Sequence, residues 1–379
     1  MGRGPSPRAA ANPPAHDPPA PATRTDPAPH RRPEAVAAVR ATREEGVLDF
    51  GVPRYIVSTE DAICCVRQPE EEQHMSEQMT WSVAAPQKLT FEQPVDDLRV
   101  RVVGGTVNVV AAEEGPARLE VADVDGPPLH VVQDGSTLTL SYEDLPWNGS
   151  QGFRKWIEGK PWKAWTGSSP DGRKAWERSV TVTLTVPAGT RVQLATVSAA
   201  AFVSGISGGT EVNGVSGDAT LVGLSGRVEA RTVSGGVEAQ SVAGEFGFHS
   251  VSGGLTVVDG AAGSVRADSV SGDMLIDLVP DPDAAKPVDV FLNSVSGQVA
   301  IRLPHPADAK VEANTATGSV SNGFADLRVT GQFGAKRITG TLGAGSGTLR
   351  ATTVSGAIAL LSRPQAAAAA PLQLDKKVL

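Results

Sequence analysis

The stretch that decides the fold is 206–259, which divides into ISGGTEVNG, VSGDATLVG, LSGRVEART, VSGGVEAQS, VAGEFGFHS and VSGGLTVVD. Each segment opens on an apolar residue, continues with Ser or Ala, and then has Gly. A fixed period of this kind is typical of stacked repeat architectures. The opening apolar residues recur at intervals of nine, beginning one segment earlier: Val197, Ile206, Val215, Leu224, Val233, Val242 and Val251.

The nine-residue unit predicts a corner followed by a short strand. The Ser-Gly pair predicts the corner, because Gly accepts positive φ and Ser can bond to nearby backbone. Positions five and seven are usually apolar and therefore share one face of the strand. A unit this short cannot bury that face alone, so we expect successive units to stack and to form a column of Val, Leu and Ala.

The repeat indicates an all-β fold, a β-solenoid over 179–361. Alternate units resemble each other more closely than neighbours do, which predicts about 18 residues per coil. The register slips by one before Val270 and the motif returns at Val295 and Val354. Two inserts, Pro280–Pro287 and Pro304–Ala309, predict loops that leave the stack.

A second β segment is expected at 75–144. From Leu89 apolar and polar residues alternate, and Asp134-Gly135 predicts a hairpin between two strand-like runs. The pattern is compatible with a β-meander or with the first turns of the solenoid. The C-terminal stretch 362–379 is rich in Ala and predicts a flexible tail.

Residues 1–74 predict a disordered tail. The first 33 residues contain ten prolines and too few apolar side chains to offset the ordering entropy. The composition changes at Met75, which favours Met75, or alternatively Met79, over Met1 as the natural start.

The segment 145–178 interrupts the strand pattern. Between Phe153 and Arg178 it carries seven Lys/Arg and three acidic residues, and Pro161 and Pro170 argue against one continuous helix. Such an insert could contact a partner or a membrane interface; alternatively, its aromatic rings cover the flank of the sheet. Our candidate contact surface consists of its tryptophans, Trp147, Trp156, Trp162, Trp165 and Trp176.

Composition excludes several classes of protein. A net charge of −8 and a pI of about 5.4 leave no basic footprint for nucleic acid. The two cysteines, Cys64 and Cys65, are adjacent and do not predict a structural disulfide. The chain shows neither a signal peptide nor an apolar run long enough to span a membrane, so we favour a cytoplasmic location, with the cell surface as the alternative.

Apparent catalytic motifs are explained by the repeat. Gly205–Gly209 matches the nucleophile-elbow string GxSxG, but Ser207 occupies the corner position of its unit. Calcium-binding nonapeptides need an Asp in every unit, whereas here Asp follows the corner Gly only at Asp218 and Asp273.

Other titratable residues do not form a recognisable site in the sequence. His130, His249 and His305 lie far apart without a ligand partner, and we expect surface or corner positions for them. Asp273 and Asp277 could face one side of the stack, although scattered acids usually serve solvation. We therefore predict no catalytic residue, no metal, no cofactor and no enzyme.

The Val-Ser-Gly repeats, GTVNVV (Gly105–Val110) and RADSVSGDM (Arg266–Met274) resemble a bacterial family of β-strand-repeat proteins. That family is common in high-GC actinobacteria, has no established function, and is labelled "putative adhesin". The resemblance covers roughly Met75–Leu379 and is best over Val197–Leu361. It implies a solenoid-like fold and brings no catalytic residues.

Three hypotheses of function follow. The first is a non-enzymatic binding or scaffold surface, adhesin-like, whose partner is a protein or a surface glycan. The second is a polysaccharide-active β-helix enzyme, which would need a charged cluster along a groove. The third is a cytoplasmic scaffold that self-associates through its exposed end strands.

Overall fold

The computed structural model describes residues 78–145, 177–279 and 289–363. They belong to one compact unit, Glu72–Leu379, and form 25 strands and no helix. The prediction of an all-β fold is confirmed. Within these ranges there is accordingly no helix that could cross a membrane.

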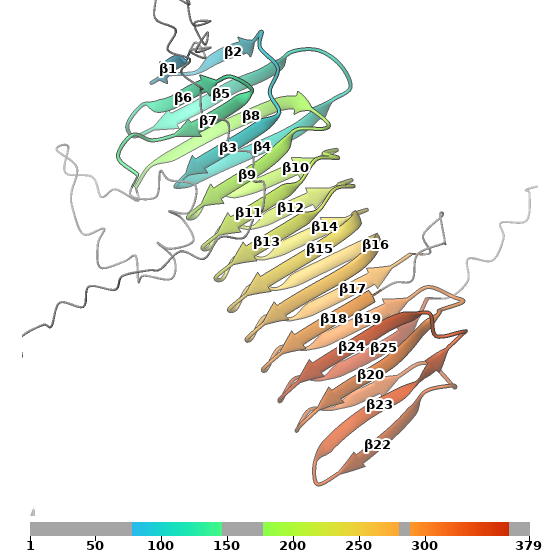
Figure 1. Cartoon of the computed structure of the whole chain (residues 1–379). Helices are drawn as coiled ribbons and strands as arrows, with labels where there is room; N and C mark the ends of the chain where they lie inside the picture. Colours follow the sequence, from blue (N-terminus) through green and yellow to red (C-terminus); the bar gives the residue numbers. More distant parts are fainter. Residues whose placement is uncertain (1–77, 146–176, 280–288, 364–379) are drawn as a thin grey trace, which may run out of the picture. The chain divides into compact units, whose positions relative to one another are not determined.

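The strands stack in two sheets whose inner faces enclose the core (Figure 1). One strand, β16, is long enough to pass through a corner and to contribute to both sheets. Sheet A has the order β1 (Met79–Val83), β6 (Leu129–Asp134), β7 (Thr137–Ser141), β3 (Asp97–Val102), β9 (Arg191–Thr196), β11 (Thr210–Gly214), β13 (Val228–Thr232), β15 (Ala243–Ser250), β16 (Leu255–Ser269), β18 (Asp289–Ser294), β24 (Gly347–Thr353), β20 (Ala309–Thr315), β23 (Ala335–Leu342) and β22 (Arg328–Gln332). Sheet B has the order β2 (Gln87–Phe91), β5 (Ala117–Asp125), β8 (Ser179–Pro187), β4 (Gly104–Ala112), β10 (Ala200–Ser204), β12 (Ala219–Val222), β14 (Val237–Gln240), β16, β17 (Met274–Leu278), β19 (Val299–Leu303), β25 (Ile358–Ser362) and β21 (Val320–Asn322).

The ladders in the middle of the stack are parallel. Thr210 pairs with Val228, and Val228 pairs with Phe246. Beyond β16 the spacing between partners lengthens, since Ser264 pairs with Asp289 and Asp289 with Thr348. The number of residues per coil therefore varies along the stack.

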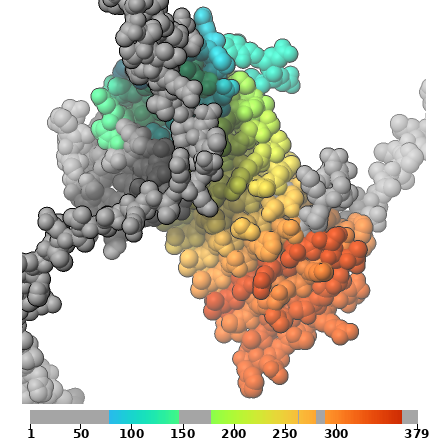
Figure 2. All heavy atoms as spheres, viewed as in Figure 1, coloured from blue at the N-terminus to red at the C-terminus, as the bar shows by residue number. Residues whose placement is uncertain are grey.

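The C-terminal coil is inserted out of chain order. β24 and β25 pair directly with β18 and β19, and β20 and β21 then pair with the far edges of β24 and β25. Figures 1 and 2 show the red C-terminal coil between orange segments that precede it in the sequence. The chain ends its stack by placing its last strands inside it.

The core is a set of columns that run through the stack. In one column Phe248 lies between its ladder partners Ala230 and Ala267, and all three are fully buried. A large ring thus packs between two small side chains, which keeps the packing dense. These are the apolar strand positions that the repeat predicts.

The Val-Ser-Gly corners use their residues differently from the prediction. A Cβ on Gly235 would lie 2.1 Å from the carbonyl oxygen of Gly217, one coil earlier. These corner glycines do not have positive φ, so the expectation of a left-handed corner is wrong for them; the coils simply approach too closely for a side chain. Positive φ occurs instead at Gly205 (75°) and Gly223 (62°), just before the opposite corner, and at Gly244 (95°), the corner glycine of the Val-Ala-Gly unit.

The corner serines bond to backbone, as predicted, but to residues 19 positions earlier rather than to nearby ones. The hydroxyl of Ser234 donates to the carbonyl of Val215 at 3.1 Å, and that of Ser252 donates to Val233 at 3.2 Å. Each hydroxyl therefore links its coil to the preceding coil. The sequence alone does not show which residues of neighbouring coils meet, so it could not predict these partners.

The N-terminal strands combine both predicted alternatives. β3 and β4 form a coil that pairs in parallel with β9 and β10. In contrast, β5 pairs antiparallel with β8, and β6 pairs antiparallel with β7. The hairpin at Asp134-Gly135 is confirmed between β6 and β7. β1 and β2 begin before Leu89, where we expected the pattern to start.

The predicted loop Pro304–Ala309 lies between β19 and β20 except for Ala309, which is the first residue of β20, while Pro280–Pro287 is outside the described residues. Of the predicted C-terminal tail, Ser362 ends β25 and Arg363 pairs with Asp259. These two residues are therefore part of the fold, and 364–379 lie outside the described residues. The predicted N-terminal tail 1–74 also lies outside the described ranges.

Candidate binding face

The tryptophans that we expected to form a contact surface, Trp147 to Trp176, lie outside the described residues. The last residue of that insert is described and is part of the fold instead. Arg178 is 4% exposed and forms a two-point ion pair with Asp144, at 2.6 and 2.7 Å. Its guanidinium lies 4.9 Å from the centre of the Tyr142 ring.

The pKa values of two residues that contact Arg178, Asp144 and Tyr142, are shifted. Hydrogen bonding to Arg178 holds the pKa of the Asp144 carboxyl below its usual range. Burial raises the pKa of Tyr142 to about 12, against the opposing effect of Arg178. The cluster joins the residue that ends the insert to residues just before its start, and its role is structural.

Ser207, the candidate elbow serine, is a corner residue. Its hydroxyl donates to the carbonyl of Ala188 at 3.0 Å. Within the described ranges no three His, Cys, Asp or Glu side chains are grouped so that they could hold a metal ion.

The acidic residues weighed above have separate roles. Asp218 accepts from the amide of Gly236 at 2.8 Å, and Asp273 accepts from the amide of Gln298 at 2.7 Å, so each links two coils. Asp277 is only 4% exposed, and we wrongly grouped it with solvated acids.

Asp277 lies in a cluster of paired charges on sheet B. Arg302 donates to both of its carboxylate oxygens. Arg363 lies 3.5 Å from it and also donates to Asp259 at 2.7 Å. Because Arg363 follows the last strand, this cluster fastens the C-terminal coil to β16 and β17.

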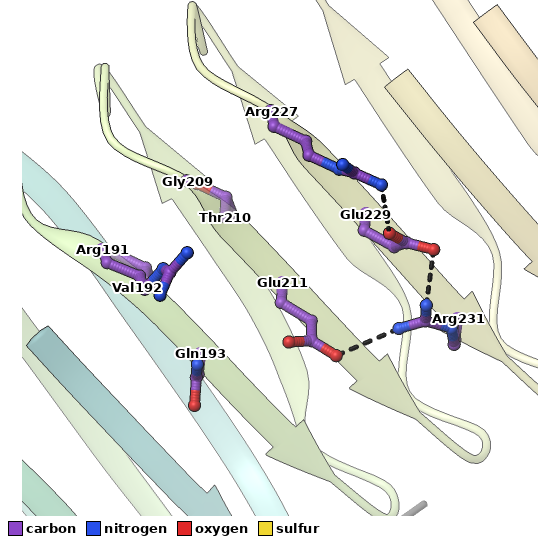
Figure 3. Close-up of a pocket in the computed structure, with 9 residues that line it drawn as sticks. All are labelled: Arg191, Val192, Gln193, Gly209, Thr210, Glu211, Arg227, Glu229 and Arg231. Carbon is purple, nitrogen blue, oxygen red and sulfur yellow. Dashed lines mark hydrogen bonds and ion pairs between the residues drawn. The ribbon is translucent and has the colours of Figure 1, made fainter. Parts of the chain in front are cut away.

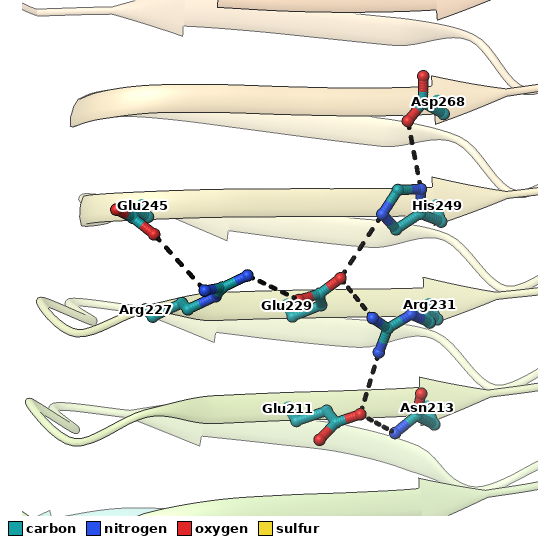
Figure 4. Close-up of polar contacts among 8 residues, drawn as sticks. All are labelled: Glu211, Asn213, Arg227, Glu229, Arg231, Glu245, His249 and Asp268. Carbon is teal, nitrogen blue, oxygen red and sulfur yellow. Dashed lines mark hydrogen bonds and ion pairs between the residues drawn. The ribbon is translucent and has the colours of Figure 1, made fainter. Parts of the chain in front are cut away.

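The outer face of sheet A carries an extended polar network among the described residues. Outward-facing positions of its parallel strands fall into columns, because the register repeats from coil to coil. Arg231 donates to Glu211 at 3.0 Å and to Glu229 at 2.5 Å. Figure 4 shows how these pairs link β11, β13, β15 and β16 into one network.

His249 extends the network. Its Nε2 lies 3.5 Å from Glu229 and its Nδ1 lies 3.3 Å from Asp268. Asn293 continues the row by donating to Asp268 at 2.8 Å. His249 lies on the surface, as expected, but within β15 rather than at a corner, and its carboxylate neighbours are residues about 20 positions away that only the stacking of the coils brings close. The signal that could have found the pair was the coil length itself. The other two predicted histidines are not part of this network: the ring of His130 lies 3.8 Å from Glu143, and His305 is in the β19–β20 loop.

A depression of about 370 Å³ opens on this face over β9, β11 and β13 (Figure 3). Gly209 is one of its lining residues and, in the register of β9, β11 and β13, stands between Arg191 and Arg227, where it contributes no side chain. A Cβ at Gly209 would lie 3.7 Å from Nε of Arg191 and 3.9 Å from the carbonyl oxygen of Arg227, which are ordinary van der Waals contacts, so a side chain can be added there without a clash. The depression is lined by Arg191, Val192, Gln193, Gly209, Thr210, Glu211, Arg227, Glu229 and Arg231.

The two arginines beside Gly209 differ from Arg231. Arg227 lies 3.6 Å from Glu229 and 3.9 Å from Glu245, which are loose contacts. Arg191 is exposed and none of the described residues forms an ion pair or a hydrogen bond with its side chain. The depression therefore presents two cationic groups with donor capacity to spare, next to carboxylates that can accept from hydroxyls.

The chain was compared with known proteins. No curated protein matches it. A "putative cell adhesion protein" from Clostridium sporogenes aligns at 11% identity over 73% of this chain and 100% of its own, with a TM-score of 0.21. A "putative lipid binding protein" from Parabacteroides distasonis aligns at 12% identity over 74% of this chain and 98% of its own, with a TM-score of 0.34.

The family comparison covers most of the described strands. The model of the Toastrack DUF4097 family, a domain family of unknown function, matches residues 95–361. This range extends from just before β3 to β25 and contains the whole charged face of sheet A. The chain belongs to the Toastrack DUF4097 family.

Proposed function

We propose that this protein is a non-enzymatic, adhesin-like scaffold that binds a carboxylated glycan on the outer face of sheet A. The depression at Gly209 is the observation that carries the proposal. Its volume, about 370 Å³, is within the range of small-ligand sites and suits a sugar ring.

The chemistry of the lining favours an acidic sugar. Arg191 and Arg227 flank the depression, and a planar guanidinium binds a carboxylate through two parallel hydrogen bonds. Glu211 and Gln193 also line the depression and can accept hydrogen bonds from sugar hydroxyls. A neutral sugar would leave the spare charge of Arg191 unused.

The surrounding network favours binding over catalysis. A glycosidase needs one carboxylic acid that stays protonated and a second carboxylate that is free to act. Here Glu211 and Glu229 are both held by Arg231, at 3.0 and 2.5 Å. Both carboxylates thus accept hydrogen bonds from the same guanidinium, which leaves neither free to act on a glycosidic bond. A fixed, ion-paired surface is suited to recognition.

The proposal is tested with a uronic-acid trisaccharide and its fully methyl-esterified form, by titration calorimetry on the full chain. We expect the acid to bind and the ester to bind at least about tenfold more weakly, because one charge-assisted bidentate contact contributes about 1.5–3 kcal/mol. Arg191→Gln and Arg227→Gln should each reduce acid binding by a similar factor.

Arg350→Gln is the matched control. Arg350 lies on the same sheet face, in β24, and contacts Glu312 at 3.7 Å, away from the depression. Equal affinity for acid and ester, or an equal loss in the Arg350 variant, would contradict the proposal. Release of shortened sugars during the titration would instead support an enzyme.

A further inference from the structure

The C-terminal end of sheet A finishes on an unprotected strand. Among the described strands, β22 pairs only with β23, and Figure 1 shows it as the last strand of the stack. All five of its residues are exposed, in contrast to the alternating burial of the inner strands. An edge of this kind presents unpaired amide and carbonyl groups to any further strand.

The core also ends uncovered at β22. Val329 is 51% exposed, although its cross-strand partner Ile338 is completely buried. Val329 thus occupies a core-facing position that lacks the next strand. Phe333, in the β22–β23 turn, is fully exposed and has a φ of 51°, a conformation that a large side chain rarely adopts.

The C-terminal end of sheet B, at β21, is capped, in contrast to the free edge of β22 in sheet A. β21 has three residues, and the chain after it folds back. The amide of Asn322 donates to the carbonyls of Phe324 and Leu327 at 2.8 and 3.1 Å and accepts from the backbone amide of Phe324 at 3.0 Å. β22 has neither such a cap nor a proline or a bulge, and its register with β23 is uninterrupted.

We propose that β22 is the docking edge for a second copy of this chain, which pairs its own β22 antiparallel about a two-fold axis through Thr330. The turn between Gln332 and Ala335 contains two residues, so these flanking residues form a hydrogen-bonded pair. From that pair on, hydrogen-bonded and non-hydrogen-bonded pairs alternate along β22 and β23. Val329 and Gly331 fall in non-hydrogen-bonded pairs with β23, so their amides and carbonyls point to the free edge.

The two-fold axis at Thr330 uses all of these groups. It sets Val329 of each copy opposite Gly331 of the other. Each of these two pairs exchanges two main-chain hydrogen bonds, which makes four in all. It also sets Arg328 opposite Gln332, so no like charges meet across the axis. An isologous contact of this kind closes as a dimer, and it would join two sheet A faces.

The test measures association of the full chain by sedimentation velocity from micromolar to millimolar concentration. We expect a monomer–dimer equilibrium. Gly331→Pro removes the outward amide and should weaken dimerisation at least tenfold, whereas Gly331→Ala keeps the amide and should not. Val329→Lys, which puts a charge on the edge without changing the backbone, is the second disrupting variant.

A disulfide trap reports the register. With Cys64 and Cys65 replaced by Ser, Thr330→Cys should cross-link to its own copy, because opposite residues of a non-hydrogen-bonded pair lie about 4.5 Å apart at Cα. Gln332→Cys, which faces Arg328 in the dimer, should cross-link much more slowly.

Several outcomes would overturn the proposal. They are a strict monomer at millimolar concentration, species that grow beyond a dimer, and a dimer that both disrupting variants leave intact. Flotation of a strictly monomeric chain with anionic vesicles, lost in Phe333→Ser, would assign this end to a membrane contact instead.

Discussion

Gly272 lies directly over Gly253 in the stack: a Cβ built on Gly272 would be 2.0 Å from the carbonyl oxygen of Gly253. The same relationship joins Gly297 to Gly272 and Gly356 to Gly297, at 2.0 and 1.9 Å. The corner glycines thus form a continuous row in which each backbone touches the next. No side chain fits between them without moving a coil.

Gly272→Ala should therefore destabilise the protein strongly. The added methyl meets backbone and cannot be relieved by a rotamer change, so we expect a loss of at least about 2 kcal/mol in the free energy of unfolding. Gly263→Ala is the matched control, because a Cβ there has no neighbour within 4 Å. Urea unfolding followed by circular dichroism measures both. Similar midpoints for the two variants would contradict the close approach.

The buried carboxylate of Asp277 should be essential for anchoring the C-terminal coil. Asp277→Asn leaves Arg302 and Arg363 without their shared partner, and we expect a loss of about 2–4 kcal/mol in the free energy of unfolding, since removal of one member of a buried pair is costly. In a double-mutant cycle with Arg302→Gln the two losses should not add. Strict additivity would show that the pair is not coupled.

The Asp144–Arg178 pair should make stability depend on pH below about 4. The pKa of Asp144 is lower in the folded protein than in the unfolded chain, so its contribution is present above the unfolded pKa, about 3.9. That contribution is lost as pH falls through the folded pKa. Asp144→Asn should cost about 1 kcal/mol at pH 7, because the carboxylate is partly exposed and screened.

Thermal unfolding at pH 7 and at pH 2.5 tests this expectation. The difference in melting temperature between Asp144→Asn and the parent should shrink at the lower pH. Glu114→Gln, an exposed residue of the β4–β5 turn, should show no such change. A difference that stays constant between the two pH values would rule out the pair as its source.

The nine-residue pattern predicted the all-β architecture and most strands, because each unit has the same local pattern: corner residues followed by a short run of alternating apolar and polar residues. Local patterns cannot report which coils touch. The insertion of β24 and β25 next to β18 and β19 joins Val354 to Val295, residues that are remote in the sequence. Both have the Val-Ser-Gly corner, whereas the later-stacked coil has Ala316-Thr317-Gly318 at that place.

The candidate site depends on such long-range neighbours. Glu211, Arg231 and His249 are ordinary polar residues in the sequence, spaced about one coil apart. They become a network only through the parallel register of β11, β13 and β15. The depression at Gly209 was hidden for the same reason: it is a missing side chain in a column, and a column is visible only when the coils are aligned.

Gly209 offers a direct test of the depression, because the space above it can be filled without disturbing the core. Gly209→Gln places a side chain between Arg191 and Arg227, where a Cβ meets nothing closer than 3.7 Å. We expect a melting temperature equal to or above that of the parent, since Gly209 does not have positive φ and replacing such a glycine reduces the entropy of the unfolded chain. Binding of the uronic-acid trisaccharide should fall at least tenfold. Gly263→Gln, at a position where a Cβ has no neighbour within 4 Å, should bind like the parent. Unchanged binding by a well-folded Gly209→Gln variant would place the ligand elsewhere on the protein.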